Sequence, residues 1–281
     1  MTSLFGCMLN EPERLQCALY PVRSAFVWRQ DRQPDGWGLG FFQGGEVLLQ
    51  KRPRPAAGPV DFYALVRGLR TDCIVGHVRL ATVGKQGRSE NTHPYRFRSW
   101  LFAHHGTIDR FAEVRPALTE HIPDFLRRNI RGQTDSEHLM HLFLAFLHDG
   151  GKLDDANLTA SEAASTLGAS LGLVDRHTTE VGGTPSPHTV IITNGRVMVA
   201  LRRGAPLHYY RIKGISDCAL CRESQGDFAR EPRRVPHEHL RGVAIIDGAA
   251  APGAPWETLP ESSAIAVSHD LTFEVKSLGA A

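Results

Sequence analysis

Segments with strand character lie toward both ends of this chain, and helical segments lie between them. Two β-hairpins are predicted where apolar runs flank a two-residue turn, at Gly44-Gly45 and at Asn194-Gly195. Further strands are predicted over residues 3–9, 73–82, 98–107, 207–213, 242–247 and 263–278. Because the strands precede and follow the helices instead of alternating with them, the chain is predicted to be an α+β protein with much antiparallel sheet.

The most distinct helix is predicted over residues 134–149. Thr134 or Asp135 can cap its start, Glu137 lies in its first turn, and Gly150-Gly151 can end it. An apolar stripe at helical spacing follows Leu139, Leu142, Phe143 and Phe146. Other helices are expected over 59–69, 109–122 and 159–174, and residues 214–240 are expected to form a long exposed loop.

The composition excludes several classes of protein. Among 281 residues, 42% are hydrophobic and 22% are charged, and the formal net charge is only +2. We therefore expect no nucleic-acid partner and no membrane partner. The sequence shows no apolar run of the ~20 residues that span a bilayer and no signal peptide. Five cysteines are an odd number, which fits a reducing compartment, so a cytoplasmic location is expected.

Cofactor motifs are also scarce. Cys218 and Cys221 have the spacing of half a zinc site, but a second cysteine pair is missing, and neither His208 nor His237 falls at a finger-like spacing. The glycine-rich stretch "GLGFFQGG" lacks the strand–helix context of a phosphate loop. The sequence predicts neither a metal ion nor a cofactor.

Five phrases along the chain carry a resemblance to a known family. They are "MTSLFG" at 1–6, "DGWGLGFF" at 35–42, "GHVRLATVG" at 76–84 with "ENTHP" at 90–94, "FAHHGTI" at 102–108, and "GQTDSE" at 132–137. In order and spacing they resemble the class II glutamine amidotransferases, N-terminal-nucleophile hydrolases that release ammonia from glutamine, and above all the short stand-alone members. The resemblance implies a four-layer αββα antiparallel sandwich and a single domain of this type over residues 1–281.

The resemblance also implies a reaction at residue 2. Removal of Met1 would make Thr2 the N-terminal residue. Its side chain would attack the glutamine amide, with its own α-amine as the base, since the unperturbed pKa of such an amine is about 7.7–8.0. Gly106 would donate a backbone N–H to the oxyanion, and His105 would stand where a second donor is expected.

The same resemblance assigns the substrate-binding residues. Arg79 would hold the substrate carboxylate, which suits a guanidinium fork, and Asp135 would hold the substrate ammonium. Thr82 and His93 would line the pocket. Taken singly, each residue has an ordinary explanation: Arg79 as a surface residue, Asp135 as a helix cap.

Three positions depart from the family pattern. Thr2 replaces a cysteine, His105 replaces an asparagine, and Ser3 stands where close relatives usually carry arginine. A hydroxyl attacks less readily than a thiol, yet threonine is used by other N-terminal-nucleophile enzymes, and an imidazole N–H can also donate to an oxyanion. Cys7 is expected to be a buried residue of the first strand and not a substitute nucleophile. Trp37 and Phe41 are expected in the core, and His77 and His104 are expected to be hydrogen-bonded structural histidines.

Two functions are left equally open by these departures. The first is an amidohydrolase that uses Thr2 on glutamine or a γ-glutamyl-like amide. The second is a weak or inactive homologue that binds an amino acid and serves a protein partner or synthase. A purely structural protein is disfavoured, because pocket residues such as Arg79 and Asp135 would then have no evident use.

Overall fold

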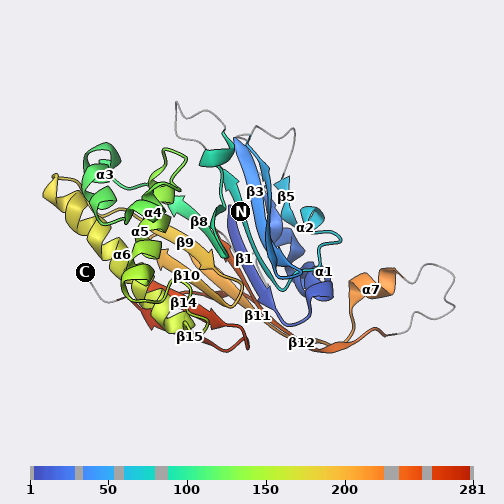
Figure 1. Cartoon of the computed structure of the whole chain (residues 1–281). Helices are drawn as coiled ribbons and strands as arrows, with labels where there is room; N and C mark the ends of the chain where they lie inside the picture. Colours follow the sequence, from blue (N-terminus) through green and yellow to red (C-terminus); the bar gives the residue numbers. More distant parts are fainter. Residues whose placement is uncertain are drawn as a thin grey trace.

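The computed structural model describes residues 3–28, 34–53, 60–79, 88–224, 234–248 and 255–278. Two antiparallel sheets lie face to face, and helices cover the outer face of each (Figure 1). The predicted four-layer αββα antiparallel sandwich is therefore confirmed.

The first sheet has seven strands in the order β13-β11-β12-β1-β6-β3-β4. Its strands are β1 (Leu4–Leu9), β3 (Gly36–Gln43), β4 (Glu46–Arg52), β6 (Cys73–Arg79), β11 (Leu207–Ile215), β12 (His237–Asp247) and β13 (Glu257–Thr258). Strand β1 lies in the middle, antiparallel to both β12 and β6. All its residues are buried because both faces of this sheet are covered, which explains the nearly continuous apolar run in its sequence. Cys7 is among them, as expected.

The second sheet has six strands in the order β15-β14-β10-β9-β8-β7. They are β7 (Tyr95–Phe97), β8 (Trp100–Gly106), β9 (His188–Thr193), β10 (Val197–Arg203), β14 (Ser263–Ser268) and β15 (Phe273–Ser277). A separate small ladder pairs β2 (Val27–Trp28) with β5 (Val60–Asp61). Both predicted hairpins are confirmed, as β3–β4 and as β9–β10.

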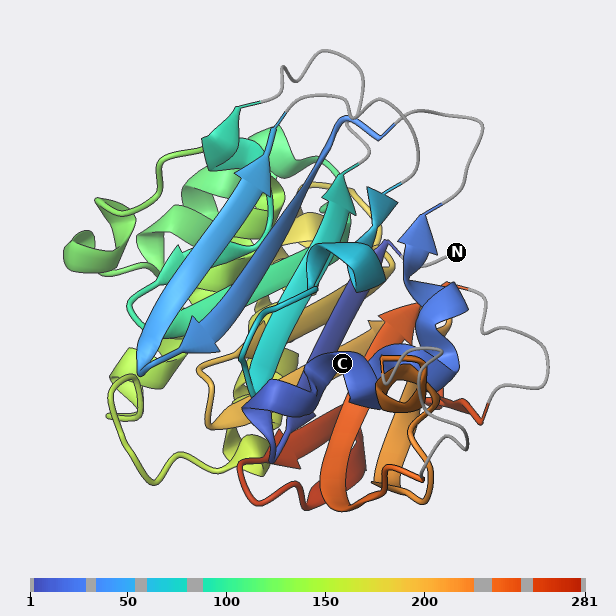
Figure 2. The same ribbon diagram turned by 90° about the vertical axis from the view of Figure 1, so that its right-hand side faces the viewer.

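The helices form two unequal outer layers (Figure 2). The second sheet is covered by α3 (Phe111–Glu120), α4 (Asp124–Arg127), α5 (Asp135–Asp149) and α6 (Ala160–Glu180). The first sheet is covered by α1 (Leu15–Leu19), α2 (Phe62–Leu65) and the 3₁₀ segments η1 (Pro12–Arg14) and η2 (Tyr20–Phe26). A short η3 (Ser89–Asn91) precedes β7, and α7 (Ala219–Glu223) lies between β11 and β12. A third apolar cluster, including Leu4, Val75 and Ile191, fills the space between the sheets.

Helix α5 begins as predicted, and Thr134 is its cap, accepting a hydrogen bond from the backbone N–H of Glu137. Trp37 and Phe41 are buried, also as predicted. Helix α6 runs on to Glu180, beyond the predicted end. The helix predicted over 59–69 exists but is much shorter: residues 60 and 61 pair as a strand, and only the single turn of α2 follows before Gly68 adopts a φ of +79°.

The exposed loop predicted over 214–240 is wrong at both of its ends, and residues 225–233 lie outside the described residues. Strands β11 and β12 remain paired as far as Ile215 and His237, and Leu240 is fully buried. Helix α7 forms in the described part of the intervening segment (Figure 1). The mixed polar sequence concealed these elements, because buried and exposed residues are mixed in this part of the β11–β12 pair, from His237 to Arg241.

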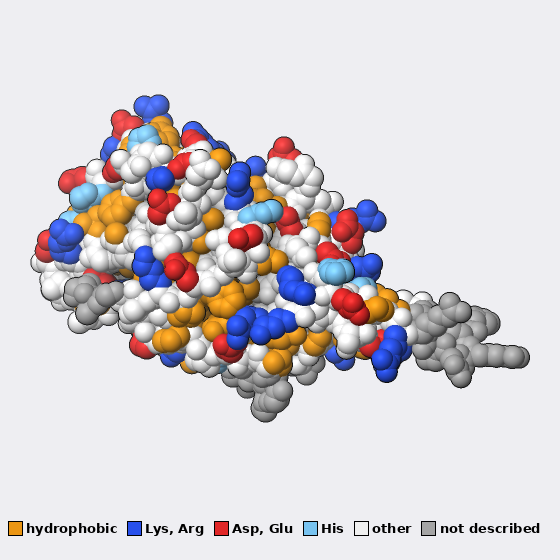
Figure 3. Space-filling model, turned by 90° about the horizontal axis from the view of Figure 1, so that it is seen from below, with side chains coloured by type: hydrophobic (Ala, Val, Ile, Leu, Met, Phe, Trp, Pro, Cys, Tyr) orange, Lys and Arg blue, Asp and Glu red, His pale blue; other side chains and the backbone are white. Residues whose placement is uncertain are grey.

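The surface carries charges of both signs. On the face shown in Figure 3, the Lys and Arg side chains of the described residues are interspersed with Asp and Glu, and apolar side chains lie between them. Among the described helices, none is long and apolar enough to cross a membrane.

Candidate active site

One cavity lies where the ends of two neighbouring strands meet the start of a helix. Arg79 is the last residue of β6, Gly106 is the last residue of β8, and Asp135 is the first residue of α5. These three residues line the cavity together with His93 and His105. The fold thus brings together predicted site residues from distant parts of the chain. Thr2 and Thr82 lie outside the described residues, but Ser3, which is bonded to Thr2, lines the same cavity.

Asp247 fixes the start of β1 at this cavity. It is buried at the end of β12, and its Oδ1 accepts hydrogen bonds from the backbone N–H groups of Ser3 (2.6 Å) and Leu4 (2.8 Å). Its Oδ2 accepts from the Ser3 hydroxyl and contacts His105 Nδ1 at 3.1 Å. No local pattern in the sequence indicated this role, since 244 residues separate Ser3 from Asp247.

The hydrogen-bond pattern determines the tautomer of His105. Its Nδ1 lies 3.1 Å from Ser3 Oγ and 3.1 Å from Asp247 Oδ2. The Ser3 hydroxyl already donates its hydrogen to Asp247, and a carboxylate only accepts. His105 Nδ1 must therefore carry a hydrogen and act as the donor in both of its contacts. The hydrogen bond with Asp247 raises the pKa of His105 above its ordinary value, although partial burial opposes this. Neutral His105 therefore has a bare Nε2, and Nε2 becomes a donor only when the ring is protonated.

Gly106 allows a close approach that a larger residue would block. A Cβ atom at this position would lie 2.7 Å from the carbonyl oxygen of Pro187 and 2.6 Å from His104 Nε2. The backbone at the end of β8 can therefore lie against these groups only because position 106 has no side chain.

Asp135 is held rigidly at the start of α5. Its Oδ2 accepts from the backbone N–H of Ile108 (2.8 Å), and its Oδ1 accepts from the backbone N–H of Ser136 (2.9 Å). Since Thr134 provides the helix cap, the Asp135 carboxylate is not needed for that task. A carboxylate beside a helix N-terminus is also stabilised by the helix dipole.

Three imidazoles line the cavity together with the buried Arg79 and are kept neutral. Burial lowers the pKa of His77 to about 3 and that of His104 to about 4, and it lowers the pKa of His93 well below its usual range. Nearby Arg79 lowers the pKa of His77 and His93 further. The cavity wall therefore presents a guanidinium among uncharged rings, an arrangement that suits an anionic group.

His77 and His104 differ from each other in their contacts. His104 is hydrogen-bonded as predicted, with Ser136 Oγ and His188 Nδ1 each at 2.9 Å. His77 instead packs against His93 with the rings tilted and their centroids 4.3 Å apart, and its buried Nδ1 has no hydrogen-bond partner in the described part of the chain. Both residues also line the cavity, which the prediction of a purely structural role did not include.

Comparison of the sequence with known proteins finds a family model and several relatives. The family model of the class-II glutamine amidotransferases matches residues 1–216. A γ-glutamyl-hercynylcysteine sulfoxide hydrolase of Mycobacterium tuberculosis is 41% identical over 106 residues, which are 37% of this chain and 43% of that protein. A probable glutamine amidotransferase of Saccharomyces cerevisiae is 30% identical over 122 residues, 41% of this chain and 34% of that protein. The matched segment thus spans less than half the length of these relatives.

Solved structures show the same fold along nearly the whole chain. A predicted glutamine amidotransferase of Pseudomonas aeruginosa superposes with a TM-score of 0.58 at 17% identity, covering 97% of this chain and 98% of that one. A glutamine aminotransferase class-II domain protein of Silicibacter pomeroyi gives a TM-score of 0.56 at 15% identity, covering 98% of both chains.

Proposed function

Because the chain belongs to the class-II glutamine amidotransferases, we propose that it is an amidohydrolase that cleaves glutamine or a γ-glutamyl amide with Thr2 as its nucleophile. One observation carries this proposal: Arg79, His105, Gly106 and Asp135 line the same cavity as Ser3, the neighbour of Thr2. The γ-glutamyl substrate in the name of the mycobacterial relative supports the choice of amide.

The proposed substrate lies with its carboxylate at Arg79 and its ammonium at Asp135, so that the side-chain amide reaches residue 2. Once Met1 has been removed, the free α-amine of Thr2 takes the proton from Oγ1, which attacks the amide carbon. The C–N bond of the tetrahedral intermediate breaks, and the nitrogen leaves as ammonia or as an amine after taking up that proton. Water then hydrolyses the ester formed with Thr2 and releases the γ-carboxylate.

The contacts of the unusual residues favour an active enzyme. Ser3 and His105, two of the three departures from the family pattern, touch each other and share Asp247 as a partner. A decayed site would more simply leave such residues unpaired. This joint arrangement supports a site rebuilt around a different oxyanion donor.

The test begins with the intact mass of the full chain, which is expected to correspond to the protein without Met1. Ammonia release from glutamine and amine release from γ-glutamyl amides are then compared for the wild type and for Thr2→Ala, which is expected to abolish both. Arg79→Ala is expected to raise KM roughly 10- to 100-fold, the value of a lost charged hydrogen bond. Arg196→Ala is the matched control, because Arg196 is exposed at the turn beyond the far end of β9.

The second function, a binding protein that serves a partner, is favoured by a different observation. Neutral His105 offers no N–H toward an oxyanion, because its ring proton is directed to Asp247. Calorimetric binding of glutamine or glutamate that Arg79→Ala removes, without any turnover of the amides, would establish this function in place of the first. Retained Met1 would also exclude the hydrolase mechanism.

A further inference from the structure

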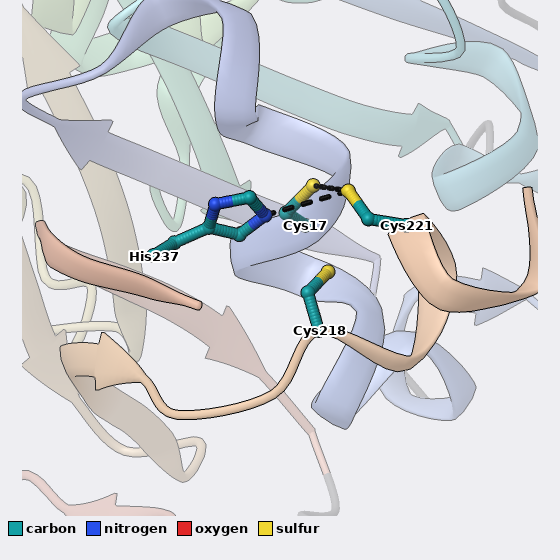
Figure 4. Close-up of side chains that lie close together, drawn as sticks. All are labelled: Cys17, Cys218, Cys221 and His237. Carbon is teal, nitrogen blue, oxygen red and sulfur yellow. Dashed lines mark hydrogen bonds between the residues drawn. The ribbon is translucent and has the colours of Figure 1, made fainter. Parts of the chain in front are cut away.

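Four potential metal ligands meet on the outer side of the first sheet, away from the cavity. Cys17 comes from α1, Cys218 directly precedes α7, Cys221 lies within α7, and His237 begins β12. Figure 4 shows the three sulfur atoms and the imidazole directed toward one another. None of these residues lines the cavity described above.

The distances among the ligand atoms suit a single ion. Cys17 Sγ lies 3.5 Å from Cys221 Sγ, and Cys221 Sγ lies 3.4 Å from His237 Nε2. All four ligand atoms lie within 4.8 Å of one another. A tetrahedral zinc site, with Zn–S near ~2.3 Å and Zn–N near ~2.0–2.1 Å, has ligand–ligand edges of roughly 3.6–3.8 Å. Small side-chain adjustments would therefore complete the tetrahedron.

The local structure holds these ligands in place without a metal ion. The backbone N–H of Cys218 donates to the carbonyl of Val235 at 2.9 Å, which ties the start of α7 to the segment leading to His237. The hydroxyl of Tyr20 donates to Glu223 at 2.6 Å, which ties the end of α7 to η2. Cys17, Cys218 and His237 are buried, and Cys221 is partly buried.

Helix α7 has little stability of its own. It has only five residues, and none of them is buried. A helix this short does not persist through its own hydrogen bonds and needs tertiary anchors. A metal ion bound by residues on both sides of α7 would supply such an anchor.

We propose that Cys17, Cys218, Cys221 and His237 form a structural zinc site that fastens the α7 segment to α1. Three thiolates and one imidazole form a closed ligand set with no position for water, which is typical of structural and not of catalytic zinc. Thiolate-rich tetrahedral sites select Zn²⁺ over hard cations such as Mg²⁺ and Ca²⁺. The site lies outside the amidohydrolase machinery, so it does not depend on the proposed function.

The zinc content of the full chain, purified under reducing conditions without chelator, provides the first test. About one zinc per chain is expected, as in other closed four-ligand sites. The double variant Cys218→Ser/Cys221→Ser and the variant His237→Gln are expected to lose it. Two matched controls are expected to keep it: Cys7→Ala, which removes a buried thiol elsewhere, and His239→Gln, which removes an exposed imidazole two residues away.

Cobalt substitution gives a second measurement on the wild type that does not require the variants to fold. Co²⁺ is expected to produce the intense visible absorption of a tetrahedral thiolate site, and zinc is expected to displace it. The proposal is overturned if the reduced wild type binds neither metal. It is equally overturned if the fresh protein contains a Cys17–Cys221 disulfide in place of zinc, or if the double cysteine variant keeps its full zinc content.

Discussion

At the scale of single residues, Ser3, His105 and Asp247 act as one unit. The Asp247 carboxylate holds the backbone at Ser3 and also fixes the proton on His105 Nδ1. Any change to one of these residues therefore affects both the position of the chain beside Thr2 and the donor capacity of His105. This coupling leads to two predictions for the amidohydrolase reaction.

The first prediction concerns pH. If His105 stabilises the oxyanion through Nε2–H, it must be protonated, while the Thr2 amine must be neutral. Activity should rise as the amine loses its proton, around pH ~7.7–8.0 for an unperturbed amine, and should fall as His105 loses its own. A plot of kcat/KM against pH for the wild type is thus expected to be bell-shaped, with a low maximum. In His105→Asn the alkaline limb should disappear, because an amide N–H does not titrate.

One outcome of the pH experiment would contradict the donor role of His105. If activity rises as His105 loses its proton and His105→Asn abolishes it, then neutral His105, oriented by Asp247, accepts the nucleophile's proton through Nε2. A profile of His105→Asn that keeps the alkaline limb would show that another group is responsible for it.

The second prediction concerns the two replaced catalytic positions. Thr2→Cys alone and His105→Asn alone are each expected to raise glutaminase activity little, and the double variant is expected to raise it by more than the product of the two. Nucleophile and donor act on the same tetrahedral intermediate, so their effects should not add as independent free energies. One oxyanion donor is worth about 2.7–4 kcal/mol in a studied hydrolase. Ammonia release by the four proteins measures the coupling, and strictly additive effects would contradict it.

At the scale of secondary-structure elements, the site depends on how closely strand β3 approaches the segment that carries His93. A Cβ atom on Gly38 would lie only 2.1 Å from the backbone carbonyl oxygen of His93. The contact joins the first sheet to the segment before β7, so it sets the position of one wall of the cavity. Strand β3 cannot easily move away, because it is paired on both sides, with β4 and with β6, so a side chain at position 38 would have to displace the His93 segment.

The third prediction follows from this contact. Gly38→Ala is expected to displace the His93 segment and to lower the free energy of unfolding by about 1–3 kcal/mol, the usual cost of overpacking. Chemical denaturation measures this change, and weaker ligand binding should accompany it. Gly172→Ala is the control: a Cβ there meets nothing within 4 Å, so this substitution within α6 should stabilise the protein by about 0.5–1 kcal/mol. Equal stability of the two variants would show that the His93 segment moves aside without a cost in stability.

At the scale of the whole molecule, many histidines are buried as neutral rings. His141 lies on the inner side of α5 with a pKa lowered to about 4 by burial, and His188 has a pKa lowered to about 2 for the same reason. In the unfolded chain such rings take up a proton near pH ~6.5. Their contribution to stability is thus fully present above that pH and is lost as pH falls toward the folded-state pKa.

The fourth prediction is a steep loss of stability in acid. Between about pH 6 and pH 4, each such histidine should lower the free energy of unfolding by up to about 1.4 kcal/mol per pH unit. In His141→Gln, unfolding is expected to take up about one proton fewer, so the dependence of stability on pH becomes less steep. His148→Gln, at an exposed position of the same helix, serves as the control. Denaturant titrations at several pH values measure the slopes. Parallel curves for wild type and His141→Gln would contradict the assignment.

Local signals in the amino-acid sequence were enough to specify several elements. The turn glycines and flanking apolar runs predicted both hairpins, and the cap and stripe of α5 predicted its start and its buried face. The hairpins and the start of α5 could be predicted because turn chemistry and hydrophobic periodicity act over a few residues. The order of the five phrases led to the family and, through it, to the sandwich. The roles of Arg79, Asp135, Thr2 and the other site residues, and the single domain over 1–281, stay predictions.

Contacts between distant residues, in contrast, follow from the tertiary fold alone. The antiparallel pairing of β1 with β12 places Asp247 beside Ser3 and His105, and the packing of α1 against β12 places Cys17 beside Cys221 and His237. No local pattern encodes such pairs, because a strand's periodicity specifies the face that it buries and not the strand that it joins. The same lack of a local signal led to the expectation of an exposed loop over 214–240, where the fold instead assembles four potential metal ligands.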